Sequence, residues 1–165
     1  MYKKTIFLTA FFLIFLSLFS PAFLKAQSIE NPRTGELVEG GGSWLIMVYI
    51  DGDNNLESYA IDDFLEMASV GSTADVSIVV QMDRIAGYST EYEDWTGCAR
   101  FAIEQGDTPV LANAEYWPDE SKEKEVDMGD PQTLEDFVDW AMQTYPASHY
   151  ALVLWNHGGG WRERI

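Results

Sequence analysis

Three runs of apolar and strand-forming residues set the organisation of the chain. They span residues 44–50 (WLIMVYI), 76–82 (VSIVVQM) and 150–155 (YALVLW), and polar or turn-forming residues follow each run. Nearly continuous apolar runs of this length are typical of strands that are covered on both faces of a parallel sheet. We therefore predict three strands of one α/β sheet.

The first of two predicted helices lies between the first two strands. Its apolar residues recur at helical spacing over residues 56–69, Asn54 or Asn55 can cap its start, and Gly71 is a suitable stop. Strand, helix and strand then form the right-handed crossover unit of parallel sheets. The acidic positions of this helix are predicted to face solvent: Glu57, Asp62, Asp63 and Glu66.

A second helix precedes the third strand. Asp130 is a candidate N-cap, Pro131 suits the first helical position, and the apolar face ends before Pro146. Between the second strand and this helix, residues 88–103 alternate with a period of two, which predicts a β-ribbon or an antiparallel edge strand. Residues 108–127 contain two prolines and mixed charge, and we predict a surface excursion rather than core.

The amino-terminal end has the parts of a secretory signal peptide. Two lysines, an apolar run over residues 5–19 and a stretch of small residues follow one another within residues 1–26. The apolar run is short for a membrane span, so we expect no stable span and a secreted or periplasmic protein. Residues 27–43, with Gly40–42, are predicted to be a flexible lead-in to a domain over residues 44–165.

The charge balance restricts the partners. The formal net charge is −17, which repels nucleic acid and anionic membranes and favours cations and cationic substrates. Solvation outside the cell is the simpler explanation of this charge. Cys98 is the single cysteine of the sequence, so an internal disulfide framework is excluded despite export.

Polar residues follow each of the three predicted strands, as Asp51/Asp53, Asp83/Arg84 and Asn156/His157. In a parallel sheet these clusters meet at one edge, where open α/β sheets bind ligands. Three glycines follow the histidine, and their backbone N–H groups suit an approaching oxyanion. The alternative is an ordinary turn at a strand end with an exposed histidine.

Four blocks in this order resemble the amino-terminal half of clostripain-family cysteine peptidases. They are WLIMVYIDGDNNLE, VVQMDR, MGDPQTLEDFVDWA and HYALVLWNHGGGW. The resemblance implies an α/β fold, a parallel-sheet, three-layer caspase-like sandwich with a β-ribbon insertion. It implies a cysteine endopeptidase that acts on peptides or proteins and favours a basic residue before the cut. His157 matches the catalytic histidine, and Gly158 matches the residue whose N–H helps to hold the oxyanion.

The family's nucleophilic cysteine stands after the histidine, at the end of the next parallel strand. The printed sequence ends at Ile165, and Cys98 precedes His157 within the alternating segment, which favours a structural role for it. We therefore expect the amino-terminal part of a peptidase domain that is incomplete at its C-terminus. Such a fragment is inactive alone, exposes a bare sheet edge, and has the cysteine-bearing C-terminal half as a candidate partner.

Acidic residues at the sheet edge are candidates for two further roles. Asp51 and Asp83 can bind a basic substrate residue. Calcium is linked to the clostripain family, but the resemblance places no ligand on a named residue. The series Asp51-x-Asp53-x-Asn55 is similar to the start of an EF-hand loop, yet it lacks the later glycine and glutamate, and an Asx-turn explains it more simply.

Two other function classes stay open. The HGGG motif also occurs as the oxyanion loop of α/β-hydrolase esterases, in which the histidine is not the base. Those folds open with antiparallel strands, whereas residues 44–82 predict a parallel unit. The second class is an exported acidic domain without catalysis.

Overall fold

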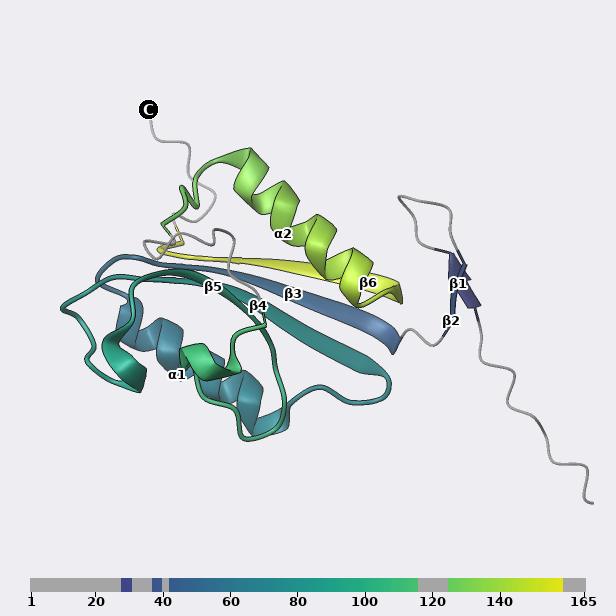
Figure 1. Ribbon diagram of the computed structural model, residues 1–165, viewed down its shortest axis with the longest axis horizontal. Coiled ribbons are helices and arrows are strands. Elements are labelled where there is room, and N and C mark those ends of the chain that lie inside the picture. Colours follow the sequence, from purple (N-terminus) through teal and green to yellow (C-terminus); the bar gives the residue numbers. More distant parts are fainter. Residues whose placement is uncertain (1–27, 31–36, 40–41, 116–124, 159–165) are drawn as a thin grey trace, which may run out of the picture.

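A four-stranded sheet lies between two helices (Figure 1). The computed structural model describes residues 28–30, 37–39, 42–115 and 125–158. The strands stand in the order β5-β4-β3-β6. Strands β3, β4 and β6 run parallel and β5 runs antiparallel to β4. The bounds of the four strands are β3 Gly42–Gly52, β4 Val76–Arg84, β5 Gly97–Ala102 and β6 Ala147–Trp155.

The three predicted parallel strands are confirmed, and each is longer than its apolar run. The alternating segment contributes the antiparallel edge strand β5, the second of its two predicted forms. A short 3-10 helix, η1 (Tyr92–Asp94), precedes β5, and a second one, η2 (Leu111–Asn113), follows it. The fold class is therefore α/β, with a mixed rather than wholly parallel sheet.

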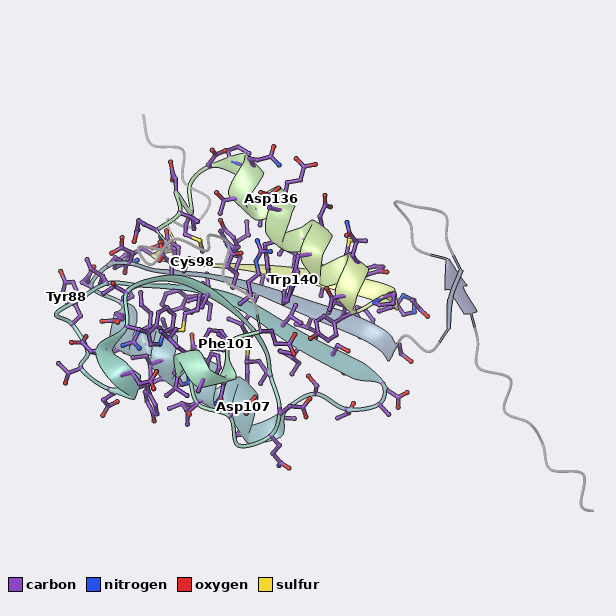
Figure 2. All side chains as sticks on the ribbon, in the orientation of Figure 1. Tyr88, Cys98, Phe101, Asp107, Asp136 and Trp140 are labelled. Carbon is purple, nitrogen blue, oxygen red and sulfur yellow. The ribbon has the colours of Figure 1, made fainter. Side chains whose placement is uncertain are left out.

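Each face of the sheet is covered by one helix. Helix α1 (Glu57–Val70) packs on the face that contains Val48, Ile50 and Phe101, and helix α2 (Pro131–Thr144) packs on the face that contains Leu45, Met47 and Tyr49. Figure 2 shows Phe101 on the α1 side of the sheet and Trp140 on the α2 side. The result is the predicted three-layer arrangement with two cores, one on each face of the sheet.

The ends of the helices follow the predictions with one exception. Asp130 Oδ1 accepts a hydrogen bond from Gln132 N at 2.9 Å, as an N-cap does. For α1 the predicted cap is wrong, because Leu56 occupies the N-cap position without a side-chain bond. Asn54 instead forms an Asx-turn, in which its Oδ1 accepts from Leu56 N at 2.8 Å.

Gly71 ends α1 for a steric reason. Its backbone has φ 73° and ψ 174°, a region that is open almost only to glycine. A Cβ at this position would lie 2.3 Å from the backbone nitrogen of Gln105. Because residues 104–106 pass so close to the end of α1, position 71 requires a glycine, as the sequence predicts.

The prediction that Glu57 faces solvent is wrong. Its carboxylate is fully buried and pairs with the buried guanidinium of Arg84, with Nε–Oε1 at 2.8 Å. Arg84 also donates to the carbonyl oxygens of Glu91 and Tyr92, each at 3.2 Å, and lies 5.0 Å from the ring centroid of Trp95. Arg84 thus holds the loop before β5 against α1. Its charge is buried there and does not reach the edge where the carboxyl ends of the parallel strands meet.

The predicted surface excursion after β5 is only partly a surface segment. Pro109 is buried, and its carbonyl oxygen accepts from Trp95 Nε1 at 2.6 Å. Residues 116–124 of this segment lie outside the described residues. The segment therefore closes one end of the α1 core, which its proline content and mixed charge do not reveal.

Before the sheet, two short strands pair antiparallel, β1 (Ser28–Glu30) with β2 (Leu37–Glu39). Both fall within the predicted lead-in, while the predicted signal peptide lies outside the described residues. Where the chain is described, no helix has the length and apolar character needed to span a bilayer.

Strand β6 is the open edge of the sheet. It pairs with β3 on one side, and in the described part of the chain no strand pairs with its other side. Leu152, Val153 and Leu154 are 42%, 44% and 64% exposed. This bare apolar edge is the one that the sequence leads us to expect.

Candidate functional site

The carboxyl ends of β3, β4 and β6 meet at one edge of the sheet. In the register Asp51 lies beside Asp83, and Ile50 lies beside Trp155, so the residues that follow β6 reach the end of β3. Gly52 allows the ends of β3 and β4 to lie this close together, because a Cβ at Gly52 would lie 2.6 Å from the carbonyl oxygen of Asp83. The predicted convergence of polar residues at one edge is therefore present.

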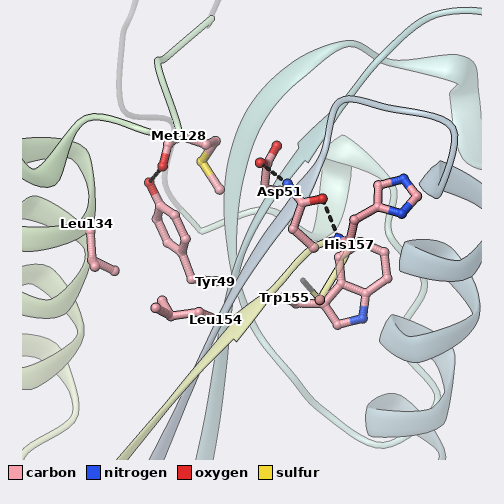
Figure 3. Close-up of a pocket in the computed structure, with 9 residues that line it drawn as sticks. Tyr49, Asp51, Met128, Leu134, Leu154, Trp155 and His157 are labelled. Carbon is pink, nitrogen blue, oxygen red and sulfur yellow. Dashed lines mark hydrogen bonds between the residues drawn. The ribbon is translucent and has the colours of Figure 1, made fainter. Parts of the chain in front are cut away.

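His157 is exposed, and the ends of two elements hold it in place. Its Nε2 lies 2.9 Å from Asn55 Oδ1, just before α1. Its backbone N–H donates to Asn156 Oδ1, and the amide of Asn156 donates to Asp51 Oδ2 (Figure 3). Two residues before the histidine, Trp155 Nε1 donates to Asp63 Oδ2 at 2.5 Å.

The bond to Asn55 indicates which nitrogen of the imidazole is free. An amide oxygen only accepts hydrogen bonds, so this contact requires the tautomer in which Nε2 of His157 is protonated. In that tautomer Nδ1 is the nitrogen without a proton. A neutral imidazole with one nitrogen engaged and the other unprotonated is suited to proton transfer.

An open cavity of about 280 Å³ lies beside the histidine. Its walls come from the ends of β3 and β6 and from the start of α2 (Figure 3). The Tyr49 hydroxyl closes one side by donating to the carbonyl oxygen of Met128 at 3.2 Å. The lining residues are Tyr49, Asp51, Met128, Leu134, Leu154, Trp155, Asn156, His157 and Gly158.

Gly158 is exposed and lines the same cavity. A Cβ at this position would meet nothing within 4 Å, so the residue borders open space. The two glycines that follow it, residues 159–160, lie outside the described residues.

The structure separates the two acids that the sequence suggests for substrate binding. Asp51 lines the histidine cavity, whereas Asp83 is 2% exposed and lines only a neighbouring cavity with Asp53 and Glu125. Burial, followed by the charges of Glu125, Asp53 and Asp51, raises the pKa of Asp83 to about 8. Asp51 remains the better placed candidate for a basic substrate group.

Cys98 lies far from the histidine, in surroundings whose net effect disfavours the thiolate. It is fully buried on β5, beside Asp83 in the register, and Figure 2 places it on the α2 side of the sheet. Three strand spacings separate β5 from β6, or about 14 Å. Burial, and next the charge of Asp83, raises the pKa of the thiol. These features support the structural role that the sequence suggests.

Sequence reasoning missed Asn55 and Glu125 as neighbours of the candidate site. The sequence presents Asn55 as a helix cap or as part of an EF-hand-like series, although it contacts the imidazole instead. Glu125 falls in the predicted surface excursion, and no pattern in that segment indicates that it returns to the sheet edge. Only the three-dimensional path of the chain brings these residues to the edge.

Comparison with known proteins decides the family. The family model of the clostripain family matches residues 48–164, which include every residue of the histidine cavity. The chain belongs to the clostripain family. Clostripain of Hathewaya histolytica is 33% identical over 126 residues, which are 72% of this chain and 24% of that protein. The chain therefore spans about a quarter of the length of this relative.

Two solved structures share the caspase-like α/β fold. One is a B. fragilis cysteine protease, with a TM-score of 0.50, 20% identity, and coverage of 74% of this chain and 95% of the other. The second is a secreted C11 cysteine protease from Bacteroides thetaiotaomicron in complex with an irreversible peptide inhibitor. Its TM-score is 0.52, its identity is 22%, and the match covers 75% of this chain and 32% of the other.

Family membership favours a cysteine peptidase over the esterase alternative. The relatives in the clostripain family are cysteine proteases. The unit β3–α1–β4 is parallel, unlike the antiparallel opening of an esterase fold. The HGGG sequence is therefore no argument for an esterase in this chain.

Proposed function

We propose that this chain supplies the histidine-bearing part of an exported cysteine endopeptidase of clostripain type. His157 is the catalytic histidine, and the N–H of Gly158 is a donor to the oxyanion. The observation that carries the proposal is the position of His157 in a clostripain-family fold. It stands exposed after a parallel strand, beside an open cavity, with one imidazole nitrogen engaged by Asn55.

The chemistry follows from this position. A cysteine thiolate attacks the scissile carbonyl, and a C–S bond forms as the carbonyl becomes an oxyanion. His157 holds the thiol proton on Nδ1 and delivers it to the departing amine, while Asn55 keeps the ring oriented through Nε2. The N–H of Gly158 stabilises the oxyanion. Water then releases the acyl group from sulfur.

The nucleophile of this reaction is not Cys98. Its thiol is buried, belongs to an edge strand on the far side of the sheet, and has a raised pKa. We propose that the nucleophilic cysteine lies on a further polypeptide segment that completes the site from the side of β6, whose open edge lies next to His157. The 165-residue chain alone is then inactive.

The test is a fluorogenic peptide assay of the full chain, with and without a cysteine-bearing segment of the clostripain family. We expect no thiol-dependent hydrolysis by the chain alone. We expect activity in the combined sample, which His157→Ala lowers by roughly 10²–10⁴-fold. His149→Ala is the matched control, because His149 is also exposed but lies within β6, whereas His157 follows its carboxyl end.

Two results would overturn the proposal. The first is cleavage by the chain alone that Cys98→Ser abolishes, because that result would make Cys98 the nucleophile. The second is a combined activity that His157→Ala and His149→Ala leave equally intact. Folding of each variant is checked by its unfolding transition, so that loss of structure is separated from loss of chemistry.

Specificity for a basic residue before the cut is a further part of the proposal. Asp51 lines the histidine cavity, and the net charge of −17 favours cationic substrates. We expect Asp51→Asn to lower kcat/KM for an arginine substrate more than for its uncharged citrulline analogue. Equal losses on both substrates would contradict this role. Export is tested separately, by locating the protein in cell fractions.

A further inference from the structure

The end of β6 is attached to helix α1 at two points. Trp155, the last residue of the strand, donates from its indole Nε1 to Asp63 Oδ2 at 2.5 Å. Two residues further on, the imidazole Nε2 of His157 lies 2.9 Å from Oδ1 of Asn55, which stands just before the same helix. One bond therefore holds the imidazole directly, and the other holds the piece of strand that carries it.

The directions of the side chains explain why both bonds go to α1. Successive side chains of an extended strand point to opposite faces, so residues two positions apart share a face. Figure 3 shows Trp155 and His157 on the side of α1, and Leu154 on the side of α2. His157 thus continues the face that Trp155 begins, although it follows the last residue of β6. The indole and the imidazole depend on the same short piece of backbone, residues 155–157.

The sheet itself gives this piece of backbone little support. The last pair in the register between β3 and β6 is Ile50 with Trp155. On its other side β6 has no partner strand in the part of the chain that the structure describes. The direction of the next two residues is therefore left to side-chain contacts, which are the bonds of Trp155, of Asn156 with Asp51, and of the imidazole with Asn55.

Asp63 can fix the indole because α1 is firmly packed around it. Its neighbours Ile61 and Phe64 are 1% and 0% exposed and belong to the core between α1 and the sheet. Asp63 and Trp155 are themselves half-buried, and Trp155 packs against that core. A hydrogen bond to a carboxylate is roughly twice as strong as one between neutral groups, and partial burial strengthens it further. The bond therefore anchors the strand end to a rigid element.

We propose that Asp63 is a positioning residue for the peptidase reaction and acts through Trp155 on the imidazole of His157. This inference rests on the proposed function, in which His157 passes a proton to the departing amine. The bond from Trp155 sets the direction of residues 155–157, so that the ring reaches Asn55 and keeps one orientation. Placement matters because a displacement of about 1 Å can lower a rate by roughly 10²-fold. Asp63 does not line the histidine cavity, so its effect is on placement alone.

The order of the imidazole is measured by NMR relaxation of its ring C–H bonds in the folded full chain. We expect the order parameter of the His157 ring to fall by at least about 0.2 in Asp63→Ala and in Trp155→Phe, from the range of rigid groups toward that of flexible ones. Trp155→Phe keeps an aromatic ring but removes the N–H donor. His149 is the internal reference, because its ring packs on Trp44 at 4.9 Å between centroids, and its order parameter should not change.

Further variants distinguish the hydrogen bond from charge and from general stability. Asp63→Asn keeps an oxygen that can accept from the indole N–H, so it should retain most of the order that Asp63→Ala loses. Asp62→Ala is the matched control, because it removes an exposed acid from the adjacent position of the same helix. The double variant Asp63→Ala/Trp155→Phe should lose no more order than either single variant, because both remove the same bond. Unfolding in urea confirms that folded chains are compared.

Activity gives a second readout in the sample combined with the cysteine-bearing segment. Asp63→Ala should lower kcat by roughly 10-fold with little change in KM, whereas Asp62→Ala should change neither. The positioning role is refuted if the His157 ring keeps its order in both folded variants, Asp63→Ala and Trp155→Phe, or if Asp62→Ala loses as much order as Asp63→Ala. The relaxation data need no nucleophile, so an inactive combined sample counts against the proposed function and leaves this first readout decisive for Asp63.

Discussion

The buried pair of Glu57 and Arg84 leads to a quantitative prediction for stability. Both side chains are fully buried, with Nε–Oε1 at 2.8 Å, so removal of one partner leaves an uncompensated charge in the α1 core. Such losses cost about 3–5 kcal/mol. Glu57→Gln keeps the size of the side chain, and we expect it to lower the free energy of unfolding by that amount.

The double variant separates the charge from the rest of the network. In Glu57→Leu/Arg84→Met no charge remains buried, but the N–H of Ser89 and the carbonyl oxygens of Glu91 and Tyr92 lose their partners. These groups lie in half-buried or exposed residues, so each loss costs about 1 kcal/mol at most. We therefore expect the double variant to be more stable than Glu57→Gln.

Equilibrium unfolding in urea, followed by tryptophan fluorescence, measures the effect directly. Asp62→Asn is the control, because Asp62 is an exposed acid on the same helix, and we expect a change within about 0.5 kcal/mol. A loss of less than about 1 kcal/mol in Glu57→Gln would refute the reasoning. A double variant less stable than the single one would also refute it.

Two further predictions concern a glycine and the cysteine. Gly71→Ala should lower the free energy of unfolding by about 3 kcal/mol, because the backbone conformation of Gly71 disfavours a side chain and its Cβ would collide with Gln105. The loss should exceed that of the control Gly106→Ala, whose Cβ would meet nothing within 4 Å. Equal losses in urea would contradict the steric reason. Cys98 should not react with a thiol reagent in the native chain up to pH 9, because burial raises its pKa, and should react fully in denaturant. Rapid native labelling would show that the thiol is accessible.

The sequence predicts most of the fold because local signals agree with the tertiary structure. The three apolar runs become β3, β4 and β6, and Asp130 and Gly71 mark helix ends as their chemistry suggests. The predicted exposure of Glu57 is wrong because its partner, Arg84, lies 27 residues away on β4. The helical pattern alone places this charged residue on the solvent-facing side. Helical periodicity contains no information about such a partner.

The candidate site is predictable to a similar extent. Asp51, Asp83 and His157 come together because the carboxyl ends of parallel strands meet at one edge of a sheet. This convergence can therefore be predicted from the sequence. The division into two cavities does not follow, because it depends on which face each side chain takes and on the return of Glu125 to the edge. Asn55 likewise contacts the imidazole only because β6 docks beside β3.

The contacts that place the imidazole also determine when the site can appear during folding. His157 to Asn55, Asn156 to Asp51 and Trp155 to Asp63 join residues 102, 105 and 92 positions apart. Closing loops of this length is entropically unfavourable until the parts between them are ordered, so such contacts form late. The unit β3–α1–β4 can assemble from nearby segments. The docking of β6 against β3 is then the step that orients the imidazole of His157.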